Sequence, residues 1–494
     1  MLAFLTSAVP SFQLPAARSS LPRSRSSLPR SRSSTLAASM PDAFLEGARE
    51  ALLAQEAMQE AAQQAAQAEA RAAIDAQWES LAQSLPAETH EQPALTLYRD
   101  TNGWCPFCER VWLQLQVKGI PFDEVLIDLR DKPDWYKEIV PTTLVPAIKL
   151  ADSGDVVWES RDIMDRLEAD FPSKPLMAAE GSPERERAVA MMDSSTEIMQ
   201  AGVRLAFGSR NQSVTDEERA AFRSDFEAAL DNLEGQIEAG GGPFMTGESF
   251  SLADATYVPM LERWAVQLPL SHGLDIRPPN ASVAPRWPAL ERWYGALAAL
   301  PAYSGRVQGD EYSWAASVGT FQRMFSANSS AELSDAAKAV VKRADYAAAV
   351  ALRSAPASSS ADAAARTQAA RKIIGNRDAI VADATSESAK SQPQLKRLAP
   401  REAPVVESVL QSAAERLVKA ETRSSRDSLE ELLDAEWTEA EMAMVRARAA
   451  KFVASRLCVP RDMGAEAGAA LRATLLEIAN EEEHLAWSRS GGLL

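Results

Sequence analysis

Apolar and polar residues alternate along short stretches of the chain between residues 94 and 158, with turn residues between the stretches. A period of two residues is typical of β-strands, so the pattern predicts strands at 94–99, 122–128, 144–150 and 156–158. Apolar residues at helical spacing fill the intervals and predict helices that end at Lys118, span 133–139 and span 160–169. This βαβαββα order predicts an α/β domain in which two parallel strands, joined by a helix, precede an antiparallel pair.

The order of these elements is that of a thioredoxin-like fold, which we expect over residues 93–175. The next segment, 182–325, has helical spacing instead and predicts an all-α domain. Its expected helices are 184–207, 215–239, 252–267 and 289–300. Ser251 and Asp254 stand at the start of the third helix with the spacing of a capping pair, in which each side chain bonds a backbone N–H group.

Two Ala-rich regions flank these domains. Residues 42–86 predict a helical N-terminal extension that ends before Pro86, and its thin apolar stripe suits packing, spacing or a partner helix. Residues 326–494 predict a further α-helical extension of unknown role, which is long enough to bind a partner.

The first 41 residues differ from the rest of the chain. They contain no Asp or Glu, carry five arginines and repeat the sequence LPRSRSS at 21–27 and 28–34. An Arg-rich, Ser-rich and acid-free N-terminus is typical of an organelle transit peptide, so we expect a plastid protein. The alternatives are a mitochondrial or cytoplasmic protein, or an unstructured basic arm that stays attached.

Composition excludes several other classes. A formal net charge of -17 over 494 residues argues against broad nucleic-acid binding, which requires neutralisation of phosphates. Three cysteines are too few for a disulfide-stapled scaffold, and three histidines leave little material for a metal centre. The sequence has no apolar run of about 18 residues, so no membrane-spanning helix is expected.

The strongest chemical signal is Cys105-Pro106-Phe107-Cys108, which stands between a predicted strand and a predicted helix. The free N–H groups and the positive end of a helix dipole favour the thiolate of a cysteine at this position. Cys108 lies one turn later, within reach of a disulfide with Cys105. A structural zinc site would need two more ligands, and two buried cysteines are the remaining alternative; the strand–helix context favours redox or thiol-transfer chemistry.

Three further features together indicate a binding site for glutathione. A cis proline at Pro146 would let the Val145 backbone pair with an extended peptide. Glu159 and Ser160 begin a helix, where backbone N–H groups donate to a carboxylate and Glu159 pairs with an ammonium group. Lys132 follows the second strand and suits the carboxylate at the other end of the peptide. Taken singly, each feature is an ordinary turn proline, helix cap or solvated lysine.

Three stretches of the sequence resemble the N-terminal domain of the cysteine-type glutathione S-transferases: CPFCERVWLQLQVKGIPFDEVLIDL, TTLVPAI and VVWESRDIMDRLE. The stretch SLADATYVPMLERW resembles the capping motif of that family's helical domain. The resemblance covers residues 93–325, and the omega, lambda and dehydroascorbate-reductase classes are the most similar, together with the chloride intracellular channel proteins. It implies a thioredoxin-like domain and an all-helical domain that bind glutathione between them, and it leaves both a monomer and a homodimer open.

The resemblance also implies roles for individual residues. Cys105 matches the catalytic cysteine that forms a mixed disulfide with glutathione, and Pro146 matches the family's cis-proline. The matching glutathione contacts are Phe107, Lys132, Val145, Glu159 and Ser160. Cys108 departs from most omega and lambda members and matches glutaredoxins instead, which allows it to act as a resolving thiol and leaves the class open.

We therefore expect a glutathione-dependent thiol transferase or reductase that acts on a small or protein-thiol acceptor, dehydroascorbate being one candidate. Glutathione is the co-substrate, and no metal is expected. The alternatives are conjugation of electrophiles to glutathione and a non-catalytic scaffold, since this fold serves unrelated functions. Membrane insertion of the kind known from the channel relatives is disfavoured.

Residues outside these motifs carry weaker expectations. Trp104 and Trp264 are candidates for the wall of an acceptor pocket, although such tryptophans are more often part of a core. Cys458 is expected to be a structural or idle thiol, and a regulatory disulfide is the alternative.

Overall fold

The computed structural model describes residues 42–87, 92–208, 214–326, 333–353, 361–386, 395–419 and 437–490. The predicted transit peptide, residues 1–41, lies outside the described residues. The chain divides into two compact units between Ala76 and Gln77.

Helix α1 (Asp42–Ser84) spans the boundary between the two units. Its residues 42–76 are the described part of the first unit, and its last turns belong to the second. It is a single helix that ends before Pro86, as the sequence predicts. Leu52, Leu53 and Met58 are exposed along it. In the second unit, Trp78 is buried and its indole Nε1 donates to Glu407 Oε1 at 3.1 Å, which secures the end of the helix.

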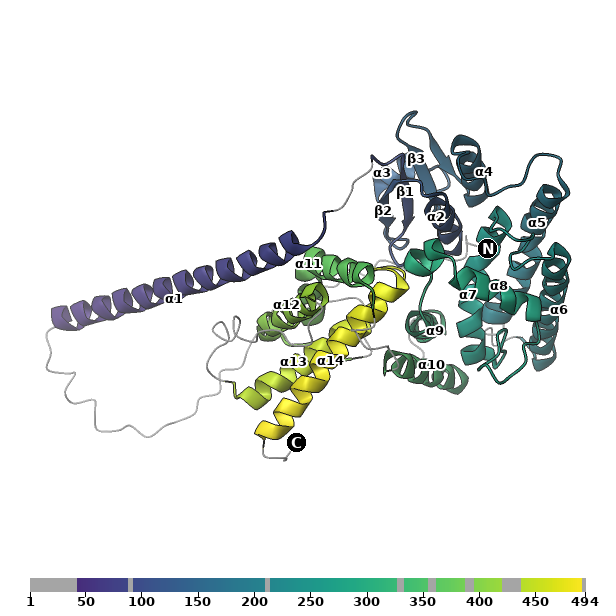
Figure 1. The fold of residues 1–494 in the computed structure, drawn as a ribbon. Helices are drawn as coiled ribbons and strands as arrows, with labels where there is room; N and C mark the ends of the chain where they lie inside the picture. The colour runs from purple at the N-terminus through teal and green to yellow at the C-terminus, as the bar shows by residue number, and fades with distance from the viewer. Residues whose placement is uncertain are drawn as a thin grey trace. The chain divides into compact units, whose positions relative to one another are not determined.

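The sheet domain of the second unit contains four strands, β1 (Leu95–Asp100), β2 (Phe122–Ile127), β3 (Ala147–Leu150) and β4 (Val156–Trp158). Their order in space is β2-β1-β3-β4. Strand β1 pairs in parallel with β2, whereas the β1–β3 and β3–β4 pairs are antiparallel (Figure 1). The α/β thioredoxin-like fold predicted from the sequence is confirmed.

Three helices cover this sheet: α2 (Pro106–Lys118), α3 (Asp134–Ile139) and α4 (Ser160–Asp170). Successive strand residues point to opposite faces. Leu95 and Leu97 of β1 therefore share a core with α2 and α4, while Tyr98 packs against Tyr136 of α3. Gly119 ends α2 in the left-handed conformation (φ 67°), which glycine adopts without steric cost.

The helical domain follows. Its elements are α5 (Pro183–Val203), η3 (Arg204–Gly208), α6 (Asp216–Gly240), α7 (Leu252–His272), α8 (Pro288–Ala298), η4 (Tyr303–Val307) and α9 (Glu311–Ser326). The predicted capping pair is present, because Asp254 Oδ2 accepts the Ser251 N–H at 2.7 Å. Asp254 is fully buried, and it also accepts the Trp293 indole N–H at 2.8 Å.

Helix α7 is longer than its sequence predicts. It continues past Gln267 to His272 although it contains Pro259 and Pro269. A proline inside a helix costs about 3 kcal/mol relative to alanine. Burial of most of the helix offsets this cost, since its residues pack against α2, α5 and α9.

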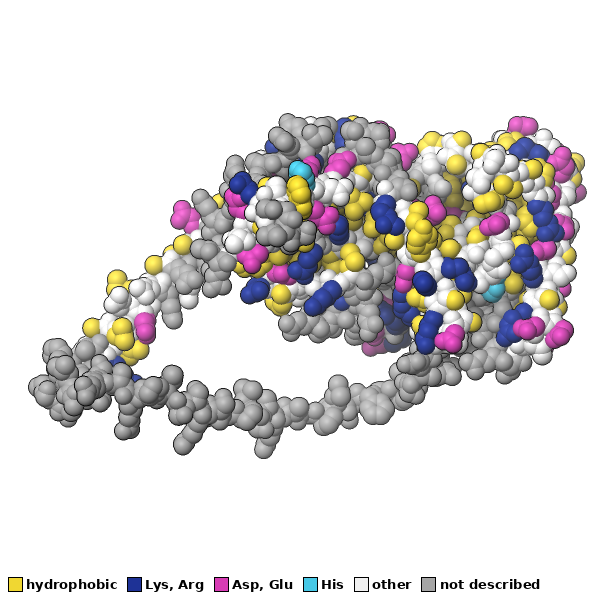
Figure 2. Space-filling view, turned by 90° about the horizontal axis from the view of Figure 1, so that it is seen from below, with side chains coloured by type: hydrophobic (Ala, Val, Ile, Leu, Met, Phe, Trp, Pro, Cys, Tyr) yellow, Lys and Arg dark blue, Asp and Glu magenta, His cyan; other side chains and the backbone are white. Residues whose placement is uncertain are grey.

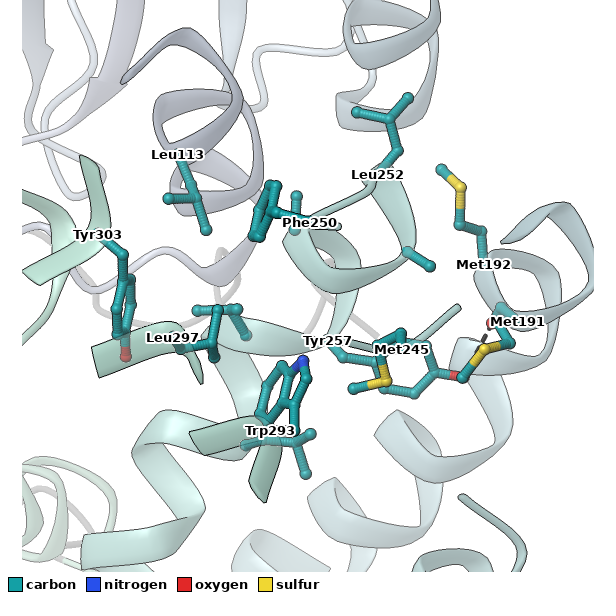
Figure 3. Close-up of a cluster of buried hydrophobic side chains, with 14 of the residues drawn as sticks. Leu113, Met191, Met192, Met245, Phe250, Leu252, Tyr257, Trp293, Leu297 and Tyr303 are labelled. Atoms are coloured by element: carbon teal, nitrogen blue, oxygen red, sulfur yellow. Dashed lines mark hydrogen bonds between the residues drawn. The ribbon is translucent and has the colours of Figure 1, made fainter. Parts of the chain in front are cut away.

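One hydrophobic core joins the sheet domain to the helical domain (Figure 3). Leu113 of α2 lies in the same cluster as Phe250, Trp293 and Tyr303 from the helical domain. Tyr257 spans part of this core and donates its hydroxyl to the Met191 carbonyl at 2.8 Å. The shared core fixes the position of α2, and hence of the CPFC motif at its start.

The C-terminal extension is helical, as predicted. It contains α10 (Asp335–Arg353), α11 (Ala363–Thr385), η6 (Pro400–Glu402), α12 (Ala403–Lys419), α13 (Glu439–Arg456) and α14 (Ala465–Arg489). Helix α10 packs on α9, and the last four helices pack against one another as a bundle (Figure 1). Buried alanines such as Ala413, Ala450 and Ala479 let these helices approach closely.

Two properties of the described surface bear on function. Among the described residues, no helix combines the length and the apolar character that crossing a bilayer requires. On the face drawn in Figure 2, the Lys and Arg side chains of the described residues are interspersed with Asp and Glu side chains.

Candidate active site

Cys105 occupies the N-cap position of α2, and Pro106 is the first helical residue. Proline suits this position because its missing N–H would have no partner in the helix. The buried carboxylate of Asp100, at the end of β1, accepts the Trp104 N–H at 2.8 Å and the Cys105 N–H at 3.2 Å. Asp100 therefore fixes the turn that presents Cys105, and the sequence analysis missed this role.

The two cysteines of the motif are both free, and they differ in environment. Cys108 is 2% exposed and Cys105 is 9% exposed. Burial raises the pKa of the Cys108 thiol well above its usual value, and the neighbouring Cys105 acts in the same direction. Cys108 therefore remains protonated at neutral pH, so Cys105 is the better placed of the two to act as a nucleophile.

Asp100, Cys105 and Cys108 are also the described residues that could hold a metal ion. One ligand atom from each lies within 4.8 Å of the others. Both carboxylate oxygens of Asp100 already accept backbone N–H groups, however.

The Val145–Pro146 peptide bond is cis and lies beside Cys105. The Cys105 Sγ is 3.8 Å from the Val145 carbonyl oxygen, within the range of a weak S–H···O bond. The Tyr136 hydroxyl donates to the preceding carbonyl, that of Leu144, at 2.6 Å. The loop that carries Val145 is thereby held against the start of α2.

Glu159 and Ser160 lie at the start of α4, as predicted. Glu159 is the N-cap residue, is exposed and has a φ of 66°, which is unusual for a residue other than glycine. Such a conformation costs on the order of 1–3 kcal/mol and is common where a ligand is clamped. Ser160 is buried at the first helical turn, where backbone N–H groups donate hydrogen bonds to anions.

Lys132 and Phe107 complete the predicted set of glutathione contacts. Lys132 is half-buried before α3, and burial together with the nearby Lys137 lowers the pKa of its ammonium group. Phe107 is half-buried in the first turn of α2, and the guanidinium of Arg110 lies 5.1 Å from the centre of its ring.

A small pocket lies between α2, α5 and α7. Its enclosed volume of about 10 Å³ is room for a single water molecule. Arg110 and Tyr257 line it together with Trp264, one of the two predicted acceptor-pocket residues. Trp264 is also a core residue, since its ring lies over Gly202 and contacts Phe226 edge-on at 5.0 Å.

Trp104, the other predicted pocket residue, does not line this pocket. Its ring contacts Phe321 of α9 at 5.2 Å between centroids. Arg110, which the sequence analysis missed, is the charged residue of the pocket. Burial lowers its pKa to about 10, while the proximity of Cys105 and Tyr257 acts in the opposite direction.

A buried ionic cluster lies behind the site and also escaped the sequence analysis. Arg263 of α7 is 2.6 Å from Glu109 of α2, and its Nη2 faces the Gly103 carbonyl oxygen at 3.4 Å. The adjacent Glu262 accepts the Trp314 indole N–H at 2.6 Å and the Tyr303 hydroxyl at 2.9 Å. Burial raises the pKa of both glutamates, and their proximity to each other raises that of Glu262 further.

Comparisons with known proteins agree with this architecture. Models of the glutathione S-transferase N-terminal and C-terminal domains match residues 104–170 and 216–296. Protein IN2-1 of Zea mays is 31% identical over 205 residues, which are 41% of this chain and 76% of that protein. Glutathione S-transferase DHAR2 of Arabidopsis thaliana is 31% identical over 169 residues, which are 34% of this chain and 71% of that protein.

The crystal structure of Chlamydomonas reinhardtii dehydroascorbate reductase is similar over 43% of this chain and 92% of its own, with 22% identity and a TM-score of 0.35. The two domain matches, and the coverage of relatives with 31% identity, show that this chain is an enzyme of the glutathione S-transferase family.

Proposed function

We propose that the protein is a glutathione-dependent thiol transferase or reductase in which Cys105 is the catalytic nucleophile. The observation that carries the proposal is the position of Cys105, which caps α2 with its sulfur 3.8 Å from the Val145 carbonyl oxygen. An extended tripeptide paired with the Val145 backbone would bring its own cysteine to this sulfur.

We assign the rest of the binding site by pairing the charged ends of the tripeptide with residues of opposite charge or with free N–H groups. The N–H groups at the start of α4 would donate hydrogen bonds to the α-carboxylate of glutathione, and Glu159 would pair with its ammonium group. Lys132 would pair with the carboxylate at the other end, and the Phe107 side chain would contact the peptide near its thiol. The assignment of glutathione as co-substrate agrees with the family to which the chain belongs.

The reaction consists of two thiol–disulfide exchanges. The Cys105 thiolate attacks the glutathione sulfur of a glutathionylated acceptor, which forms the Cys105–glutathione disulfide and releases the acceptor as a thiolate. The thiolate of a second glutathione then attacks this disulfide, which yields oxidised glutathione and regenerates the Cys105 thiolate. A small oxidised acceptor such as dehydroascorbate would be reduced to ascorbate at the expense of two glutathione thiols.

Cys108 is a poor candidate for the second step. Its raised pKa keeps it protonated, whereas the attacking species in thiol–disulfide exchange is a thiolate. We therefore favour a monothiol route. Conjugation of electrophiles is the less suitable activity, because a cysteine in this position forms its mixed disulfide by exchange with glutathione disulfides and does not activate the free glutathione thiol.

The proposal is tested with purified protein, hydroxyethyl disulfide and reduced glutathione, and separately with dehydroascorbate. Turnover that is present in the wild type and lost in Cys105→Ser supports the proposal. A wild-type protein without Cys105-dependent turnover on either acceptor overturns it and favours a scaffold role.

We also propose a plastid location, which rests on the Arg-rich, acid-free composition of residues 1–41. A fusion of residues 1–60 to a fluorescent protein tests it. Import and shortening of the fusion in plastids support the location, and retention of the full-length fusion in the cytoplasm contradicts it.

A further inference from the structure

The loop between α13 and α14, residues 457–464, reaches the part of the sheet domain that precedes Cys105. We call it the extension loop, and we call residues 101–104 the catalytic loop. The extension loop is an integral part of the core: Val459 is fully buried, and Met463 is 2% exposed. Its position therefore cannot change without exposing apolar side chains.

The two loops are in direct contact. A Cβ atom on Gly103 would lie 3.4 Å from the Arg461 backbone nitrogen, so the two backbones pack together there. Trp104 contacts the thiol of Cys458 in the extension loop. Burial raises the pKa of this thiol. Gly103 and Trp104, the two residues that directly precede Cys105, are thus both in contact with the extension loop.

Two direct hydrogen bonds, and a bridge through Arg472, anchor the extension loop to the helical domain. Arg306 Nη1 donates to the Pro460 carbonyl at 2.7 Å, and the Val459 N–H donates to Ser313 Oγ at 2.9 Å. Arg472 of α14 donates to the Leu457 carbonyl at 2.8 Å and pairs with Asp310 at the start of α9.

Arg306, which donates to the extension loop, also contacts α2. Its guanidinium lies 4.3 Å from the ring centre of Trp112, and Arg99 lies 4.4 Å from the same ring. Contacts of this kind contribute roughly 0.5–2 kcal/mol, depending on how far they are desolvated. Arg306 therefore contacts both the extension loop and the helix that Cys105 caps.

Close backbone packing fixes the end of the extension loop. A Cβ atom on Gly464 would lie 1.7 Å from the Gly305 carbonyl oxygen, so no side chain fits at this position. Gly305 belongs to η4, the element that carries Arg306. The extension loop is thus held at its start by Arg472 and at its end by this contact.

We propose that the extension loop is a positioning element for Cys105, with Arg472 as the residue that anchors it. Asp100 holds the catalytic loop from the sheet side, and the extension loop bounds it on the side of Gly103 and Trp104. Because Cys105 is the N-cap of α2, the direction of its side chain depends on the catalytic loop. The consequences for catalysis rest on the function proposed above.

The test compares two buried arginines of the extension in the full-length protein. Arg472→Met removes the anchor, whereas Arg446→Met removes an arginine whose partners, Glu482, Ser408 and Ser412, all belong to α12 and α14. We expect Arg472→Met to lower kcat for hydroxyethyl disulfide about tenfold or more, since small displacements of a reacting group have effects of this size. KM for glutathione stays within about twofold, because the predicted glutathione contacts lie outside the extension loop.

Arg446→Met should leave both constants unchanged, and Arg472→Lys should restore part of kcat. Equal effects of Arg472→Met and Arg446→Met on kcat would overturn the proposal, and so would a change confined to KM. If Arg472→Met does not fold, Ser313→Ala removes the acceptor of the Val459 N–H and tests the same anchor.

A second measurement is independent of thiol transfer and therefore distinguishes failure of this proposal from failure of the proposed function. Hydrogen exchange of the peptide that contains residues 101–108 should be faster in Arg472→Met than in Arg446→Met. Equal exchange in the two variants contradicts the positioning role, whether or not the wild type transfers thiols.

Discussion

Arg263 of α7 forms a 2.6 Å ion pair with Glu109, which lies in the first turn of the helix that Cys105 caps. Arg263 is 6% exposed and Glu109 is 2% exposed. The Glu109 N–H in turn donates to the Cys105 carbonyl at 3.2 Å. A charge from the helical domain therefore secures the active-site helix of the sheet domain.

Replacing Arg263 by methionine should destabilise the protein strongly. Removal of one partner leaves Glu109 buried without its cation, which typically costs about 3–5 kcal/mol. Urea denaturation measures the effect. Arg292→Met is the matched control, since the Arg292–Glu238 pair is more than half exposed and should contribute about 1 kcal/mol or less. Similar losses in the two variants would contradict the structural role of Arg263.

The raised pKa of Glu262 makes stability depend on pH. Burial holds this carboxyl in its neutral form, so its contribution is fully present below the usual value of 4.5 and is lost as pH rises toward the raised pKa. We expect the free energy of unfolding of the wild type to fall over this interval more steeply than that of Glu262→Gln. Glu238→Gln, at an exposed site, should keep the wild-type slope.

The two cysteines of the CPFC motif should respond differently to replacement by serine. Cys105→Ser should abolish thiol transfer, and Cys108→Ser should retain most of it, because the buried Cys108 thiol stays protonated. Steady-state assays with hydroxyethyl disulfide measure both variants. Comparable loss in both would indicate a dithiol mechanism.

The same difference should appear in chemical modification. At pH 7, iodoacetamide should alkylate Cys105 well before Cys108, whose raised pKa and 2% exposure both suppress reaction. Peptide mass spectrometry on the native protein measures the order, and denatured protein is the control in which the two cysteines react alike. Faster labelling of Cys108 in the native state would contradict the assignment.

The pocket wall at Trp264 should tolerate no added volume. A Cβ atom on Gly202 would lie 2.3 Å from the Trp264 ring, so Gly202→Ala should destabilise the protein by about 1–3 kcal/mol. Gly235→Ala in α6 is the matched control, because a Cβ atom there meets nothing within 4 Å and alanine favours the helix. Thermal denaturation of the two variants should shift in opposite directions.

Much of the fold could be predicted from the sequence because local patterns determine it. The alternation that marks β1, the proline that begins α2 and the glycine that ends it are all readable without tertiary information. The extent of α7 was not predictable in this way, because packing on all sides outweighs the local effect of Pro259 and Pro269.

The candidate site divides in the same way, into residues that local motifs predict and residues whose roles depend on tertiary contacts. Cys105, Pro146 and Glu159 lie in short motifs with recognisable spacing, and the structure places them at the expected turns. Arg110 and Arg263 carry no such signal, because their roles depend on residues that are distant in the sequence. Arg110 lines a pocket together with Tyr257, and Arg263 pairs with Glu109. The contact between Arg461 and Gly103 is likewise invisible in sequence, since 357 residues separate the two.

Mass spectrometry of the native protein incubated with oxidised glutathione tests the central claim most directly. The account predicts one added glutathione, on the peptide that contains Cys105, and no adduct in Cys105→Ser. An adduct on Cys108 or Cys458 in place of Cys105, or an unmodified wild type under conditions that modify a small thiol, would contradict it.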